Sequence, residues 1–130
     1  SPQWRAWSGY AFEYICINHV AAIKKGLGIG NVYTEVSPWK SSITEKGAQI
    51  DLLLDRNDRI INICEIKFSE SPYTITKAYA DNLRNKIGTF QAATNTRKAT
   101  FLTMVTTYGI VKNKHSYLAQ NNITMEELFE

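Results

Sequence analysis

The sequence predicts a single α/β domain in which helices flank a mixed central sheet. Two stretches carry apolar residues at helical spacing, and four others are rich in β-branched and aromatic residues. A short turn joins the second and third strands, which favours antiparallel pairing. A helix stands between the third and fourth strands, and such a connection is usually a right-handed parallel crossover.

The first predicted helix begins at Ser8, whose hydroxyl suits an N-cap, and ends near Gly26. Its apolar side consists of Phe12, Cys16, His19 and Ile23. The β-branched and aromatic residues of 31–37 predict a strand that ends before Pro38, because proline has no N–H for a ladder. The polar residues 40–47 predict a loop.

Two further strands, over 48–55 and 60–68, surround a polar turn. A helix over 76–91 follows. Its apolar positions are Ala80, Leu83, Ile87 and Phe90. A strand over 99–107 comes next, and a capping box at Thr124 opens a short last helix. The expected order is α, β, β, β, α, β and a short C-terminal helix.

The composition fits a globular protein that folds as one domain over residues 1–130. Hydrophobic residues make up 44% of the chain and charged residues 21%, both close to the globular average. Cys16 and Cys64 lie in apolar surroundings, which indicates small core residues and a reducing, cytoplasmic setting. No apolar run approaches the roughly 20 residues that cross a bilayer, so no membrane contact is expected.

Three charged residues interrupt the two hairpin strands: Asp51 in the first, Glu65 and Lys67 in the second. An unpaired charge is expensive to bury, so their presence needs a physical reason. Side chains alternate along a strand, which places Asp51 on the face of Leu53 and Glu65 on the face of Lys67. The alternative is an exposed Glu65–Lys67 ion pair on an edge strand, but the apolar neighbours favour a central strand.

The length of the connecting turn decides whether the two carboxylates meet. Directly opposed residues of an antiparallel pair lie on the same face. A three-residue turn at 57–59 places Asp51 opposite Glu65. A two-residue turn shifts the register by one residue and separates them.

Two converging carboxylates repel each other unless a cation lies between them. Carboxylate oxygens with open coordination positions suit Mg²⁺ or Mn²⁺, which keep several waters and bind substrate phosphates. We therefore expect Asp51 and Glu65 to be metal ligands, with the backbone carbonyl of Ile66 as a third. Lys67 would orient the attacking water or help to deprotonate it, and the metal would stabilise charge on the phosphate.

Asp51 is followed 14 positions later by Glu65-Ile66-Lys67, and the predicted elements have the order α-β-β-β-α-β. This motif and order resemble those of the PD-(D/E)xK nuclease superfamily. The resemblance implies a restriction-endonuclease-like αβββαβ core with a mixed central sheet flanked by helices. It also implies a metal-dependent nuclease that hydrolyses phosphodiester bonds in nucleic acid, with DNA as the expected substrate. Asp51, Glu65 and Lys67 would be catalytic, and Glu13 matches by position the acidic residue of the family's first helix.

Four segments carry a narrower resemblance. They are GAQIDLLLDR, INICEIKFS, ADNLRNKIGTF and FLTMVTTYGI. Together they look like the C-terminal nuclease-like domain of prokaryotic AAA-type ATP-binding proteins. This implies a domain excised from a longer ATPase, with an AAA-type ATPase domain as partner in the same full-length chain, since no GxxxxGK[ST] phosphate loop occurs here. One departure is visible, because Ile50 stands where the wider family motif usually has a proline.

Phosphate contacts are expected from Lys77, Arg84 and Lys86, on the helix that follows the second hairpin strand. Residues 77–114 contain seven basic residues against one acidic residue, Asp81, although the net charge of the chain is only +3. A solvated helix face is the alternative for these residues. For the whole domain, the alternative to an enzyme is a catalytically inactive nuclease-like module that binds nucleic acid or protein for an ATPase.

Overall fold

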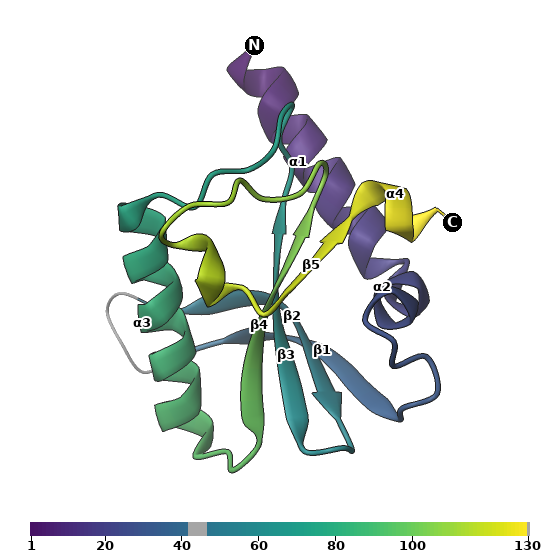
Figure 1. Ribbon diagram of the computed structural model, residues 1–130, viewed down its shortest axis with the longest axis vertical. Helices are drawn as coiled ribbons and strands as arrows, with labels where there is room; N and C mark the ends of the chain where they lie inside the picture. The colour runs from purple at the N-terminus through teal and green to yellow at the C-terminus, as the bar shows by residue number, and fades with distance from the viewer. Residues whose placement is uncertain (42–46, 130) are drawn as a thin grey trace.

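A five-stranded mixed sheet forms the centre of the computed structural model, which describes residues 1–41 and 47–129 (Figure 1). The strands lie in the order β1-β2-β3-β4-β5. They are β1 (Thr34–Lys40), β2 (Gln49–Arg56), β3 (Ile60–Lys67), β4 (Ala99–Thr106) and β5 (Asn121–Thr124). β1, β2 and β3 pair antiparallel, whereas β4 lies parallel to β3 and β5 parallel to β4. The predicted α/β class and mixed sheet are therefore confirmed.

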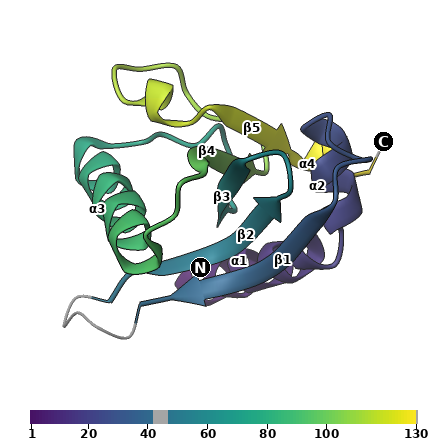
Figure 2. The same cartoon turned by 90° about the horizontal axis from the view of Figure 1, so that it is seen from below.

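Helices cover both faces of the sheet (Figure 2). They are α1 (Pro2–Ile17), α2 (Val20–Gly26), α3 (Lys77–Thr94) and α4 (Met125–Leu128), with a short 3-10 helix η1 (Ser116–Leu118). One core cluster joins α1, α2 and α4 to the sheet, and a second cluster joins α3 to the opposite face. β3 is the central strand, and all of its residues between the two ends are buried, as expected with helices on each side.

The predicted N-cap at Ser8 is wrong, because α1 is capped by Ser1, whose hydroxyl accepts from the Trp4 N–H at 3.2 Å. Ser8 lies inside the helix and is buried on the same side as Phe12. A serine can cap a helix or fill a small space within one, so the local pattern does not separate the two roles. The predicted single helix is also divided, since the chain turns at 18–19 before α2 begins.

β1 does not end before Pro38, as predicted, but runs on to Lys40. It is an edge strand, the place in a sheet that tolerates a residue without an N–H. The register against β2 shifts beside the proline, between Ser37 and Trp39. The loop predicted after this strand falls mainly on 42–46, outside the described residues.

The helix between β3 and β4 is confirmed, and it extends to Thr94. It begins after the N-cap Thr76, whose hydroxyl accepts from the Tyr79 N–H at 3.2 Å. It ends at Asn95, which has a left-handed backbone with φ 51°. The predicted parallel crossover from β3 to β4 is present.

β5 and η1 were not predicted from the sequence. β5 begins with Asn121 and Asn122, a residue type that is depleted in strands. Their side chains bond to β4 and so replace the apolar contacts of an ordinary strand. The Thr103 hydroxyl donates to Asn121 Oδ1 at 3.2 Å, and Asn122 Nδ2 donates to the Thr106 hydroxyl at 3.1 Å.

Two smaller predictions are confirmed. Cys16 and Cys64 are both buried and free. The Glu127 carboxylate accepts from the Thr124 N–H at 3.2 Å, as predicted for the start of α4. Across residues 1–41 and 47–129, no helix has the length and apolar character needed to cross a bilayer.

Candidate active site

The β2–β3 hairpin has the register that the predicted site requires. Leu52 lies opposite Cys64, the last paired residues towards the open end of the hairpin. Three residues connect β2 to β3, and the last of them, Arg59, has a left-handed backbone with φ 72°. Continued by one residue, this register places Asp51 opposite Glu65. Of the two turn lengths that the sequence left open, the structure has the three-residue turn.

Beyond the last pair, side chains take over the bonding between the two strands. The Ile66 N–H donates to Asp51 Oδ2 at 2.9 Å. The Asp51 N–H lies 3.5 Å from Glu65 Oε2, which is long for a hydrogen bond. The regular ladder has ended here, and two carboxylates lie side by side where the strands separate.

β2 carries an irregularity at the same place. Ser37 of β1 lies opposite Leu53 of β2, and Trp39 lies opposite Ile50. The chain therefore advances by three residues in β2 where it advances by two in β1. Ile50 and Leu53 consequently both belong to the core cluster that packs against α3. Strict alternation along β2 is therefore interrupted between Ile50 and Leu53, because the extra residue of a bulge changes the face on which the side chains beyond it lie.

Glu65 lies on the central strand and is 1% exposed. Burial is the main reason that its pKa is raised, and the neighbouring Asp51 raises it further. The Lys86 ammonium opposes both effects, with Nζ 2.6 Å from Glu65 Oε1. An exposed pair of Glu65 and Lys67 on an edge strand is therefore excluded.

Glu13 and Lys67 meet at a surface hollow of about 310 Å³, which Ile66 also lines. Glu13, on α1, is half-buried, and its pKa is raised first by burial and second by Asp51. Lys67 acts on the same carboxyl in the opposite direction and lowers its pKa. Side chains from α1, β2 and β3 therefore share one electrostatic environment.

Tyr79 on α3 is part of this group, although the sequence did not single it out. The Lys67 ammonium lies over its ring, 5.0 Å from the centroid. Its hydroxyl is buried and makes no hydrogen bond of good geometry within the described residues. Burial raises the pKa of this hydroxyl, and the nearby Glu65 carboxylate raises it further. The open end of the hairpin thus contains a buried polar group that is left incompletely bonded.

Lys86 does not lie with the exposed basic residues of α3, where a phosphate contact was expected. Its side chain is 15% exposed, and its ammonium is paired with Glu65. A signal for this position exists in the sequence. Tyr79, Leu83, Lys86 and Phe90 are spaced by four, three and four residues. That spacing places the lysine in the row of α3 residues that face the sheet.

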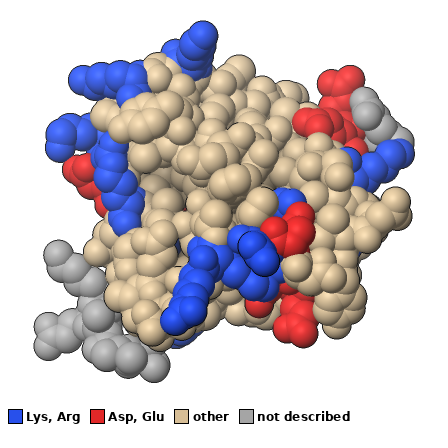
Figure 3. All heavy atoms as spheres, turned by 60° about the horizontal axis from the view of Figure 1, so that its bottom comes forward, with Lys and Arg blue, Asp and Glu red and all other residues tan. Residues whose placement is uncertain are grey.

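Lys77 and Arg84, the other residues expected to contact phosphate, are on the surface. Their side chains are 79% and 45% exposed, and both pair with Asp81, at 3.1 Å and 3.3 Å. Figure 3 shows basic side chains gathered on the α3 side of the molecule. Exposed ion pairs of this kind contribute little to stability, so both cations are able to exchange Asp81 for a ligand phosphate.

The residues at the open end suit a hard divalent cation. The donors are the carboxylates of Asp51 and Glu65 and the carbonyl of Ile66, the ligand types that Mg²⁺ and Mn²⁺ prefer. The Glu65 carboxylate already binds one cation, the Lys86 ammonium. Within 1–41 and 47–129, no group of three or more His, Cys, Asp or Glu side chains is placed to hold a metal ion. A metal on the predicted ligands would need water or substrate oxygens to complete its coordination.

Comparison of the chain with protein-family models, with curated proteins and with solved structures finds no match in any of the three. The resemblance to PD-(D/E)xK nucleases therefore rests on the sequence motif itself.

Proposed function

We propose that this chain is a metal-dependent nuclease domain of the PD-(D/E)xK type, with a restriction-endonuclease-like core, that hydrolyses phosphodiester bonds in nucleic acid. One observation supports this function above all. Asp51 and Glu65 lie side by side where β2 and β3 separate, close to a hollow lined by Glu13 and Lys67. DNA is the proposed substrate.

The acidic residues at the open end would hold the metal. Asp51, Glu65 and the Ile66 carbonyl would bind Mg²⁺ or Mn²⁺, and such an ion, when bound, stabilises negative charge on phosphate and favours the ionisation of water. The protein fixes both carboxylates in advance. Burial restricts Glu65, and the Ile66 N–H holds Asp51.

Lys67 and Glu13 would act on the water and the phosphate. Lys67 is one of the residues that line the hollow, and from there its ammonium would orient an attacking water and stabilise charge on a phosphate oxygen. The raised pKa of Glu13 makes its carboxylate a better proton acceptor than an exposed glutamate, which suits it to receive a proton from that water. The Tyr79 ring helps to hold the Lys67 ammonium in place.

Exposed cations on α3 would position the nucleic acid. Lys77 and Arg84 point into solvent on the face beside the Glu65 strand, and contacts to phosphates fix the register of a bound nucleic acid without reading its sequence. An AAA-type ATPase domain in the same full-length chain is the partner that we propose, and the cytoplasm is the compartment.

A second function is favoured by a specific observation. Lys86 already neutralises Glu65, so the carboxylate pair is partly compensated without a metal ion. A catalytically inactive nuclease-like module, which binds nucleic acid or protein for an ATPase, would require no more than this.

Cleavage of single-stranded, duplex and branched DNA with Mg²⁺ or Mn²⁺ tests the enzyme. Lys67→Ala should lower the cleavage rate by about 100-fold or more, because it removes a positioned ammonium from the reacting groups. Lys98→Ala is the matched control. It also removes an ammonium, in this case from an ion pair with Asp55 of β2, which lies towards the turn of the hairpin.

Three results distinguish the two functions. Cleavage that falls in Lys67→Ala and persists in Lys98→Ala supports the nuclease. Cleavage that persists in Lys67→Ala contradicts the proposed site. DNA binding by the unaltered protein without cleavage under any of these conditions supports the inactive module.

A further inference from the structure

Glu65 and Lys86 form the most buried ion pair among the described residues. Their side chains are 2% and 15% exposed. In each of the other ion pairs, at least one side chain is 38% exposed or more. A pair placed this deeply loses much of its hydration, and apolar residues of similar volume often serve stability as well or better. Packing therefore does not explain why α3 places a lysine here.

The position of Asp51 does explain it. Asp51 and Glu65 lie side by side, and the pKa of Glu65 is raised first by burial and second by the Asp51 charge. The Lys86 ammonium, 2.6 Å from Glu65 Oε1, supplies the cation that two adjacent carboxylates require. It occupies the side of Glu65 that a metal ion bound through Oε1 would need.

The charges around the site indicate what happens when a divalent cation arrives. Three carboxylates, of Glu13, Asp51 and Glu65, are opposed by two ammonium groups, of Lys67 and Lys86, which leaves one net negative charge. A divalent cation and Lys67 alone would balance all three carboxylates. With Lys86 still in place, the same group would carry an excess positive charge, which is unfavourable where hydration is poor.

The two lysines differ in how easily their ammonium groups can move away from the carboxylates. Lys67 is held over the Tyr79 ring and lies at the hollow. Lys86 contacts Glu65 directly, and its long, flexible stem allows the ammonium to reach solvent without a movement of α3.

We propose that Lys86 is a resident counter-cation, which holds Glu65 in the metal-free protein and leaves the carboxylate when a divalent cation binds. This role rests on the proposed function, and it makes metal binding an exchange of one cation for another. Lys86 is then a positioning residue, because its ammonium holds the Glu65 carboxylate in place between turnovers.

Reductive methylation of lysines, followed by mass spectrometry, observes the exchange directly in the unaltered protein. Lys86 should react slowly in a chelator and at least several-fold faster with saturating Mg²⁺ or Mn²⁺, because its ammonium is released to solvent. Lys98, in its own ion pair with Asp55, is the internal control and should react at the same rate in both conditions.

Calorimetric titration with Mg²⁺ adds a second readout. Lys86→Met should bind the ion about tenfold more tightly or better, because the competing charge has been removed from within a few ångströms of it. Lys98→Met should bind as the unaltered protein does. If Lys86→Met does not fold, the labelling result decides.

The outcomes separate this role from the proposed function. Metal binding with Lys86 still protected, or without tighter binding in Lys86→Met, overturns the exchange and leaves the nuclease intact. An absence of metal binding in both proteins overturns the metal site and the exchange together. Binding in Lys86→Met alone supports Lys86 as the occupant of the cation position and overturns the nuclease.

Discussion

The two ends of the β2–β3 hairpin both gather charged residues, but they differ in how completely the charges are paired. At the turn end, the carboxylate of Asp58 has two hydrogen bonds from one guanidinium. At the open end, Asp51 and Glu65 lie side by side, and the Lys86 ammonium pairs with Glu65 alone. The strands are the same, so the contrast comes from the side chains that surround each end.

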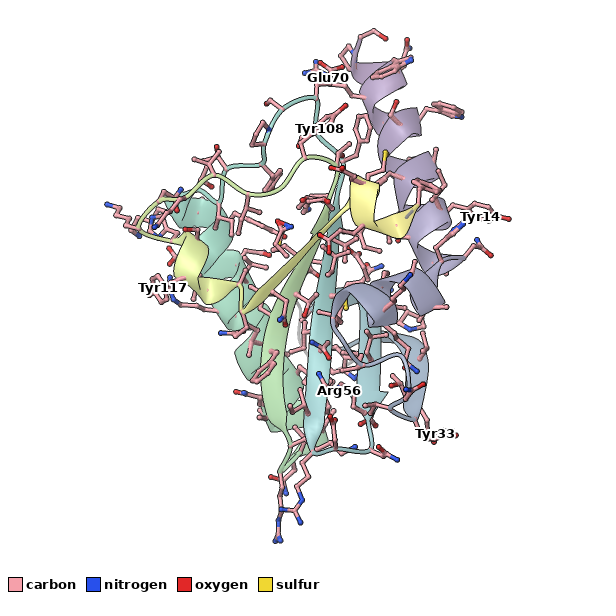
Figure 4. All side chains as sticks on the ribbon, turned by 45° about the vertical axis from the view of Figure 1, so that its right-hand side comes forward. Tyr14, Tyr33, Arg56, Glu70, Tyr108 and Tyr117 are labelled. Atoms are coloured by element: carbon pink, nitrogen blue, oxygen red, sulfur yellow. The ribbon has the colours of Figure 1, made fainter. Side chains whose placement is uncertain are left out.

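Arg56 organises the turn end, where Figure 4 shows it. It is 9% exposed, and it donates to both Asp58 oxygens, at 2.9 Å and 2.6 Å, and to Asn62 Oδ1 at 3.1 Å. Asn62 in turn donates to the Thr103 hydroxyl at 2.9 Å. The hydrogen bond from Arg56 is the main reason that the pKa of Asp58 is lowered.

The carboxyl pKa values shift in opposite directions at the two ends of the hairpin. A lowered pKa, as for Asp58, means that the folded protein stabilises the charged carboxylate. The raised pKa values of Glu13 and Glu65 mean that the fold holds these carboxylates at a cost. Groups held at a cost in one place are a mark of functional sites, because a ligand is able to compensate them.

The largest expected effect on stability is at the turn end. Arg56→Met should lower the free energy of unfolding by about 2 kcal/mol, because it leaves the buried amide oxygen of Asn62 without its donor. Urea denaturation followed by circular dichroism measures this. Metal affinity at the open end should not change, and a matching loss of metal affinity would show that the two ends are not independent.

The same substitution should have opposite signs at the two ends. Asp51→Asn keeps an oxygen for the Ile66 N–H and removes the repulsion with Glu65, so in a chelator it should raise the free energy of unfolding by about 1 kcal/mol. Asp58→Asn should lower it, since the charge that pairs with Arg56 is lost. Unfolding of the two variants under identical conditions checks the signs. If both variants changed the free energy of unfolding in the same direction, the proposed difference between the two ends would be contradicted.

A smaller effect is expected in the pH dependence of stability. The raised pKa of Glu65 stabilises the fold fully below its ordinary value of 4.5, and this contribution is lost as pH rises through the folded pKa. The lowered pKa of Asp58 stabilises the fold above its ordinary value of 3.8, and that contribution is lost as pH falls. Asp51→Asn should flatten the first decline and Asp58→Asn the second. Unfolding midpoints across a pH series in chelator test this, and an unchanged profile in either variant would contradict it.

The hairpin could be predicted because the relevant information is local: polar residues separate two apolar runs. The register could not be predicted, because the sequence allowed a turn of two or three residues, and only the three-residue turn of the structure brings Asp51 to Glu65. The crossover through α3 could be predicted, since its apolar spacing is regular. The bulge in β2 could not be predicted, because no residue type in the strand indicates where an extra residue is inserted.

The cation on Glu65 could not be predicted, because it depends on which residue of α3 faces the end of β3. Helical spacing places Lys86 in the row that packs on the sheet, but it does not say how far the side chain reaches. β5 was missed for a similar reason. Its asparagines look like loop residues until β4 supplies hydroxyl partners for them.

Titration of the metal-free protein with Mn²⁺, followed by electron paramagnetic resonance, tests most directly whether the open end of the hairpin is a divalent-cation site. The unaltered protein should bind one ion per chain, and Asp51→Asn should lose that ion while it remains folded. Absence of binding in the unaltered protein, or equal binding in Asp51→Asn, would contradict a metal site between these two carboxylates.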